Sequence, residues 1–320
     1  MKKIAMVLAC FALVSMSMTA QVAKIALQHS GNVKLYDADQ MSAVMTAAVD
    51  GDTIYLNEGS FTGDFTISKK VSIIGAGEKT ILTGAVTVNI PGSPTLTAHL
   101  LDALNIQSAI HFSSPTKGAK IRKCQFVGLD FKATTEDAMI DRCYSRGEDS
   151  YSFWLSNYVK NLNVVNSKIY SIRGNTADSS DANFINCNIY QITNYTGEYC
   201  NAIYMNCIIR WWINGGSNSH SSSTMYINCL CGTYQYTFSV NQNCWNVDNS
   251  NLLNKNVDCK FDDTQLQNNG YLGTDGTVVG ITGGSTPFTL VPTVPKVTDY
   301  TIKVDPETKK LNVNLKVSAN

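Results

Sequence analysis

The feature that most constrains the fold is a repeat of about 20 residues in the second half of the chain. The stretches VVNSKIYSI, FINCNIYQI, YMNCIIRWW and YINCLCGTY align without gaps, at steps of 20, 20 and 22 residues. Three columns recur in them: Asn166, Asn186, Asn206 and Asn228; Ser167, Cys187, Cys207 and Cys229; Ile169, Ile189, Ile209 and Cys231. A period of this length is typical of solenoids, in which each repeat stacks on the one before.

The residue types distinguish two kinds of solenoid. A leucine-rich repeat places Leu at several fixed positions of each unit. Here the repeat is filled by Ile, Tyr, Val and Phe, which favour strands. In FINCNIY, the residues Ile185, Cys187 and Ile189 alternate at period two, as on a strand with one buried face. The sequence therefore predicts an all-β fold, a single-stranded parallel β-helix.

Cysteines extend their column upstream, at Cys124 and Cys143. Neighbouring coils lie about 4.8 Å apart, within the Cα range of a disulfide, but parallel Cβ vectors keep the Cβ atoms slightly too far apart. We therefore predict a ladder of buried free thiols and keep disulfides as the alternative. For the Asn column we predict a structural role, in turn or ladder hydrogen bonds made by the side-chain amides.

The first 20 residues have the three regions of a secretory signal: MKK, the apolar run IAMVLACFALV and the small-residue segment SMSMTA. Cleavage would leave a chain starting near Gln21 that is secreted, periplasmic or attached to the cell surface. Lipidation at Cys10 is the less favoured alternative, because more apolar residues follow that cysteine.

The remaining chain divides into four predicted parts. Residues 21–50 hold an N-terminal strand and a cap helix, in which Met41, Val44, Met45, Ala48 and Val49 recur at helical spacing after an Asp39 N-cap. Solenoid ends need covering, and this helix would cap the first coil. The coils occupy residues 51–245, and an irregular section occupies residues 246–297. A β-hairpin with the turn DPETKK occupies residues 298–320.

A family resemblance accompanies this pattern. The stretch AAVDGDTIYLNEGSFTGDFTISKKVSIIGAG resembles the opening of secreted bacterial right-handed parallel β-helix proteins of the pectin-lyase-like superfamily, in an uncharacterised branch. The stretch GITGGSTPFTLVPTVPKV is similar to the tail of many such proteins. The superfamily includes pectate lyases, polygalacturonases and non-enzymatic members, so the resemblance implies the fold and not the function. The Gly-His-Gly and Arg-Ile-Lys motifs of its polygalacturonases are absent.

One titratable residue precedes each of three repeat cysteines by nine positions: Asp178, Glu198 and His220. Two carboxyl groups about one coil apart fit a retaining glycosidase, and close carboxylates raise one pKa so that one group can act as an acid. His220 would then either tune the carboxyl pair or transfer a proton. One alternative is a calcium site, since calcium takes oxygen ligands. The other is that these residues lie in solvated turns without function, which is favoured because all three fall in predicted loops.

A second column is predicted to point outward from the sheet: Arg146, Tyr170, Tyr190 and Arg210. Aromatic rings stack on sugars and Arg binds carboxylates with two hydrogen bonds, so this strip would hold an acidic polysaccharide. The alternative is that the tyrosines serve cross-strand packing.

Composition excludes other function classes. The chain has 25 acidic and 25 basic residues and no basic run, which argues against nucleic acid as a partner. No segment after the signal approaches the ~20 apolar residues of a membrane span.

His29, His99 and His111 are isolated, and no Cys/His spacing resembles a zinc site. No cofactor is predicted apart from the calcium alternative, and the oligomeric state stays open.

These features predict a protein that binds polysaccharide along an elongated face without turnover. One alternative is a polysaccharide lyase or glycoside hydrolase that uses the coil-aligned acids. The other is a structural or adhesin-like surface module.

Overall fold

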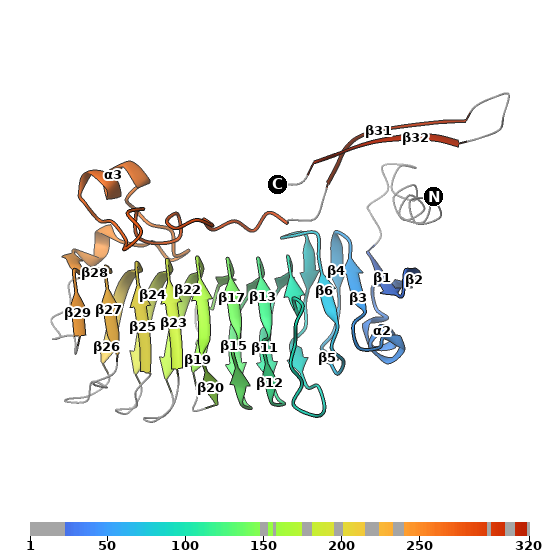
Figure 1. Ribbon diagram of the computed structural model, residues 1–320, viewed down its shortest axis with the longest axis horizontal. Helices are drawn as coiled ribbons and strands as arrows, with labels where there is room; N and C mark the ends of the chain where they lie inside the picture. The colour runs from blue at the N-terminus through green and yellow to red at the C-terminus, as the bar shows by residue number, and fades with distance from the viewer. Residues whose placement is uncertain are drawn as a thin grey trace.

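The structure is a computed structural model of the 320-residue chain. It describes residues 23–147, 153–155, 158–174, 181–194, 201–214, 224–232, 240–292, 296–304 and 311–318. Over these ranges the protein is mostly β and forms a right-handed parallel solenoid, whose axis lies horizontally in Figure 1. The predicted all-β parallel β-helix is confirmed.

The first long sheet, sheet A, has 12 strands within the described ranges. Its N-terminal edge is an antiparallel pair, β1 (Lys24–His29) and β2 (Asn32–Asp37). The strands that follow are parallel to one another, one per turn: β3 (Thr53–Leu56), β6 (Ser72–Ile74), β9 (Leu101–Asp102), β13 (Lys120–Arg122), β17 (Met139–Asp141), β21 (Leu162–Val165), β23 (Asp181–Ile185), β25 (Asn201–Met205), β27 (Met225–Ile227) and β29 (Val240–Gln242).

The second long sheet, sheet B, has 15 strands in the described ranges and forms two rows. The first row contains β4 (Gly59–Phe61), β7 (Thr80–Leu82), β10 (Asn105–Ile106), β14 (Gln125–Phe126), β18 (Tyr144–Ser145), β22 (Lys168–Gly174), β24 (Asn188–Asn194), β26 (Ile208–Asn214), β28 (Leu230–Gly232) and β30 (Trp245–Val247). The second row contains β5 (Phe65–Ile67), β8 (Val86–Val88), β11 (Ala109–Phe112), β15 (Gly128–Phe131) and β19 (Phe153–Leu155), and the long β22 bridges both rows. A small third sheet contains β12 (Thr116–Lys117), β16 (Thr135–Glu136) and β20 (Val159–Lys160).

The corner between sheet A and the first row of sheet B is formed by one residue of left-handed conformation per coil. The Asn column occupies this position in four coils, with φ between 45° and 56°. Asn tolerates this region better than most residues because its short polar side chain bonds locally. The corner leaves Cys187 and Ile189 buried, as predicted, but turns Ile185 outward beside the buried Phe184. The prediction that Ile185 faces the core was wrong, because two strands meet at Asn186.

The interior of the solenoid is filled by columns of like residues. Phe184, Tyr204 and Tyr226 stack with ring centroids 5.1 and 4.9 Å apart. Beside them runs the thiol ladder: Cys124, Cys143, Cys187, Cys207, Cys229 and Cys244, with Ser167 replacing one member.

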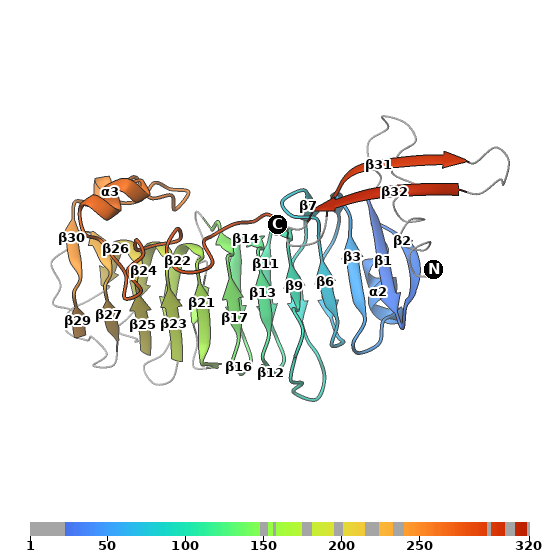
Figure 2. The ribbon, with the colours of Figure 1, turned by 45° about the horizontal axis from the view of Figure 1, so that its top comes forward.

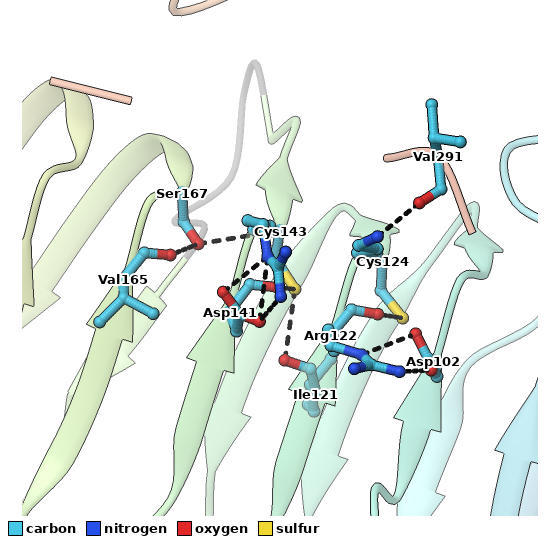
Figure 3. Close-up of polar contacts among 11 residues, drawn as sticks. Asp102, Ile121, Arg122, Cys124, Asp141, Cys143, Val165, Ser167 and Val291 are labelled. Carbon is cyan, nitrogen blue, oxygen red and sulfur yellow. Dashed lines mark hydrogen bonds and ion pairs between the residues drawn. The ribbon is translucent and has the colours of Figure 1, made fainter. Parts of the chain in front are cut away.

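The eight cysteines of the described ranges are all free, which confirms the predicted thiols. Each ladder sulfur donates to backbone carbonyl oxygens; Cys207 Sγ lies 3.3 Å from those of both Phe184 and Met205. Burial raises the pKa of the Cys207 thiol well above its ordinary value, so the ladder behaves as small apolar packing. Figure 3 shows the same arrangement at Cys124 and Cys143.

A short helix, α2 (Met41–Ala47), lies at the N-terminal end of the solenoid. Met41, Val44 and Met45 are buried in the main core, as their spacing predicts. Two details differ. The N-cap residue is Gln40 instead of Asp39, without a side-chain cap bond, and Val49 lies beyond the last turn with 46% of its surface exposed.

After β30 the chain turns back and runs over the corner toward the N-terminal end, as Figures 1 and 2 show. We call residues 248–292 the strap; it contains the 3₁₀ turn η1 (Asn249–Asn251) and the helix α3 (Asp263–Asn268). Corner side chains hold its backbone: Asn228 Nδ2 to Leu272 O at 3.2 Å, Thr274 N to Asn206 Oδ1 at 3.0 Å, Asn166 Nδ2 to Gly283 O at 2.8 Å and Lys123 Nζ to Val291 O at 2.6 Å. These Asn amides therefore bind the strap.

Beyond the strap, β31 (Lys296–Val304) and β32 (Leu311–Ser318) pair antiparallel as a separate two-stranded sheet. Among the described residues, no helix has both the length and the apolar character needed to cross a membrane.

Candidate functional site

The predicted catalytic residues Asp178, Glu198 and His220 lie outside the described residues. Their alignment on consecutive coils stays a prediction.

The predicted substrate-binding strip is in register. Strand pairing places Ile169, Ile189 and Ile209 side by side, so Tyr170, Tyr190 and Arg210 follow one another on successive coils. The rings of Tyr170 and Tyr190 stack with centroids 4.9 Å apart and planes 10° apart. The Arg210 guanidinium lies 4.8 Å from the centroid of Tyr190. Tyr170 on the preceding coil and Arg210 on the following coil therefore both contact the Tyr190 ring.

The strap covers the part of this strip formed by Tyr170, Tyr190 and Arg210. Tyr170 and Tyr190 are partly buried against an apolar cluster that contains Leu252 and Leu253 of the strap. Arg210 Nη1 donates to Leu253 O at 2.6 Å. Arg146 Nη2 donates to Ile106 O at 3.0 Å, and burial lowers the pKa of Arg146 from its ordinary value. Contacts within the chain therefore engage the strip, and sugar binding there stays a prediction that requires the strap to move.

A different outward column lies on the second row of sheet B. Strand pairing aligns His111 of β11 with Asp130 of β15, Asp130 with Trp154 of β19, and Trp154 with Arg173 of β22. We call these four residues the HDWR column. Each comes from a consecutive coil, about 4.8 Å from the next.

Alternation along each strand directs these side chains outward. In β11 the flanking Ile110 and Phe112 are buried, and in β19 the flanking Phe153 and Leu155 are buried. Since successive side chains of a strand point to opposite faces, the residue between each buried pair faces solvent. The prediction that His111 is isolated was wrong, because the pairing of β11 with β15 places it beside Asp130.

The members of the column contact one another. His111 Nδ1 lies 3.2 Å from Asp130 Oδ2, and Lys132 Nζ lies 3.4 Å from the same oxygen. The Arg173 guanidinium sits 4.4 Å from the centroid of the Trp154 ring. The side chains of His111 and Asp130 keep 27% and 29% of their surface exposed. The column thus combines hydrogen-bonding groups, cationic groups and an indole on one accessible surface.

Its chemistry suits a hydroxyl-rich ligand. Carboxylate and imidazole groups bond hydroxyls, an indole packs against apolar C–H surface, and Arg binds planar anionic groups. Lys132 and Arg173 carry two positive charges against the single negative charge of Asp130, which favours anionic over cationic ligands.

A third polar group, on sheet A, is internally paired. Arg122 donates from Nε to Asp102 Oδ1 at 3.2 Å and from Nη2 to Asp102 Oδ2, and Arg142 donates to both oxygens of Asp141 (Figure 3). Asp102 is buried, and its hydrogen bond raises the pKa of Arg122. Arg122 and Asp102 neutralise each other between two coils, and Arg142 and Asp141 do so within one coil, so we assign these charges a structural role.

Over the part of the chain that the structure describes, no group of three or more His, Cys, Asp or Glu side chains is arranged to hold a metal ion. The calcium alternative concerns Asp178 and Glu198, which lie outside that part.

The sequence matches no protein-family model and no curated protein. The resemblance to the pectin-lyase-like superfamily therefore rests on the sequence stretches quoted above.

Proposed function

We propose that this protein binds a polysaccharide along the outer face of sheet B, outside the cytoplasm and without turnover. The observation that carries the proposal is the HDWR column, in which four consecutive coils each present one polar or aromatic side chain in line. A linear polymer lying along the solenoid axis would meet these groups in sequence. The parallel solenoid and the opening motif also support membership of the pectin-lyase-like superfamily.

Binding is favoured over catalysis because the column lacks a second carboxylate. Glycosidases use two carboxyl groups that flank the bond to be cleaved, whereas Asp130 is the one acidic member of this column. The enzyme alternative depends on Asp178, Glu198 and His220. The third alternative, a structural or adhesin-like module, requires no ligand on the column.

The test is affinity for a panel of acidic and neutral polysaccharides, measured by isothermal titration calorimetry. Trp154→Ala removes the indole and its contact with Arg173, and we expect affinity about tenfold lower, equivalent to about 1.4 kcal/mol. Tyr55→Ala removes an exposed aromatic residue from sheet A and is the matched control. Flat isotherms with every polymer, or equal losses in both variants, would contradict the proposal.

Incubation of the same polymers with the protein, with and without calcium, separates binding from turnover. We expect neither new reducing ends nor absorbance of unsaturated products. Product that disappears in Asp178→Asn or Glu198→Gln would establish the enzyme alternative. N-terminal sequencing of protein from the extracellular and periplasmic fractions tests the proposed location, with a start near Gln21 expected.

A further inference from the structure

The outer face of sheet A changes character along the solenoid. Toward the N-terminal end it carries the paired charges of β9, β13 and β17. Further along, one outward position is apolar in β21 and β23, beside the outward Asn163 and Asn183, and both are apolar in β25 and β27. We call the following residues the apolar stripe: Val165, Ile185, Ile203, Met205, Met225 and Ile227.

The stripe residues point outward and remain partly exposed. The residues between them point inward; Val164, Phe184, Tyr204 and Tyr226 are at most 2% exposed. Strand pairing keeps the stripe residues side by side over four coils. The strap reaches its edge, where Thr274 Oγ1 lies 3.8 Å from Met205 Sδ. A contiguous, partly exposed apolar surface of this kind marks an interaction site.

The pairing register of the C-terminal hairpin separates its apolar residues from its polar residues. The pairs Val304 with Leu311, Ile302 with Val313, Tyr300 with Leu315 and Val297 with Val317 are all apolar. The pairs between them are polar: Lys303 with Asn312, Thr301 with Asn314 and Asp299 with Lys316. Residues opposite each other in an antiparallel pair share a face, and alternate pairs return to it. The register therefore gathers the apolar pairs on one face of the ribbon.

An isolated two-stranded hairpin is at best marginally stable in water. Sheet pairing joins β31 and β32 to each other and to no other described strand. Packing of the apolar face on a second surface would supply the missing stabilisation.

The hairpin leads away from the stripe of its own chain. The strap ends beside the N-terminal coils, where a Cβ added at Gly77 would meet the Pro292 ring at 3.0 Å. The hairpin then extends beyond that end of the solenoid (Figures 1 and 2). The stripe begins at β21, on the far side of β9, β13 and β17.

We propose that the hairpin of one copy packs with its apolar face on the apolar stripe of a second copy. Because the two surfaces are different and lie toward opposite ends of the molecule, the contact is heterologous. Such contacts propagate head to tail unless a rotation closes them into a ring. The partner is thus another copy of this chain, and the interface is independent of polysaccharide binding.

Sedimentation velocity over a wide range of protein concentration tests the proposal. We expect the average mass of the purified protein to rise with concentration. Ile302→Lys in the hairpin and Ile203→Lys in the stripe should each give a monomer. The matched controls are Thr301→Lys, on the other face of the hairpin, and Ile74→Lys, an outward isoleucine of sheet A beyond the charged region. Both controls should assemble normally.

Mixing the two interface variants distinguishes this contact from a symmetric one. The Ile203→Lys protein retains its hairpin and the Ile302→Lys protein retains its stripe, so the mixture should form dimers and nothing larger. A monomer at every concentration, or assembly that persists in both variants, would overturn the proposal. Circular dichroism of each variant shows that the solenoid remains folded. A monomeric wild type whose hairpin is protected from proteolysis would instead place the hairpin on its own chain.

Discussion

The left-handed backbone conformation recurs at the corner of the solenoid, where Asn both adopts this conformation and binds the strap. Asn206 adopts φ 56°, and its amide both accepts from Thr274 N at 3.0 Å and lies 3.3 Å from Thr274 Oγ1. The left-handed conformation costs most residues about 1–2 kcal/mol relative to the right-handed one. An Asn at the corner therefore reduces strain and anchors the strap.

The two roles can be separated by substitution. Asn206→Gly keeps the backbone conformation accessible but removes the amide, and should lower the free energy of unfolding by about 1–2 kcal/mol. Asn206→Ala adds backbone strain and should lower it by about 1 kcal/mol more. Urea denaturation measures both values. Equal losses would contradict the assignment of strain, and Asn243→Ala, at an exposed corner with φ 54°, reports strain without the buried amide.

His99 gives the molecule a dependence on pH. Its pKa is lowered from the ordinary value, first by burial and then by the positive charge of Arg122. The unfolded chain therefore binds a proton more readily than the folded chain. The stability contributed by neutral His99 is fully present above its unfolded pKa, about 6.5, and is lost as pH falls through the lower folded value.

We expect His99→Gln to weaken the decline in unfolding free energy between about pH 7.5 and pH 5. Urea denaturation of both proteins at several pH values measures this difference. An identical slope in the variant would show that His99 does not contribute.

At the scale of elements, the strap is a separate unit that side chains from several coils attach to the solenoid. Asn188 Nδ2 donates to Val257 O at 3.0 Å, and its Oδ1 accepts from Ile281 N at 3.3 Å. Loss of one such residue weakens the attachment without removing a strand pair. Segments of this kind open more easily than the sheets beneath them.

Asn188→Ala should therefore accelerate amide hydrogen exchange in residues 257–284 about fivefold or more, since one or two hydrogen bonds contribute about 1–3 kcal/mol. Exchange in β23 and β25 should be unchanged. Mass spectrometry of peptic peptides resolves the two regions. Equal acceleration in both would mean that strap and solenoid open as one unit.

The repeat predicted the element type and the buried columns because strand stacking converts sequence period directly into spatial neighbours. It failed at the corner, where Ile185 points outward, because the alternation of one strand does not continue through a left-handed residue. The course of the strap was also not predictable. Its contacts join residues far apart in the chain, such as Arg210 with Leu253 and Asn166 with Gly283, and carry no period.

The HDWR column could have been found from the sequence. Its steps of 19, 24 and 19 residues resemble those of the Cys column. It was missed because its members are chemically different, whereas the repeat was recognised from identical residues. The Arg and Tyr strip was placed in the correct register, but the covering strap could not be inferred from a pattern local to the coils.

At the scale of the whole molecule, stability is distributed along the axis. Each coil contacts mainly its neighbours, so the free energy is close to a sum of coil and interface terms. Deleting residues 187–206 would join Asn186 directly to Cys207 and restore the repeat in phase. The next coil could then pair with the preceding one through the same columns.

We expect this 20-residue deletion to fold, with a circular dichroism spectrum of the same shape and an unfolding free energy several kcal/mol lower, on the order of one coil and its interface. Deleting residues 187–196 removes half a coil and shifts every later column to the wrong face. That variant should not fold cooperatively, and thermal denaturation followed at far-ultraviolet wavelengths compares the two. If the half-coil deletion melts as sharply as the full-coil deletion, the columns do not set the register, and the strap becomes the element that holds the coils in phase.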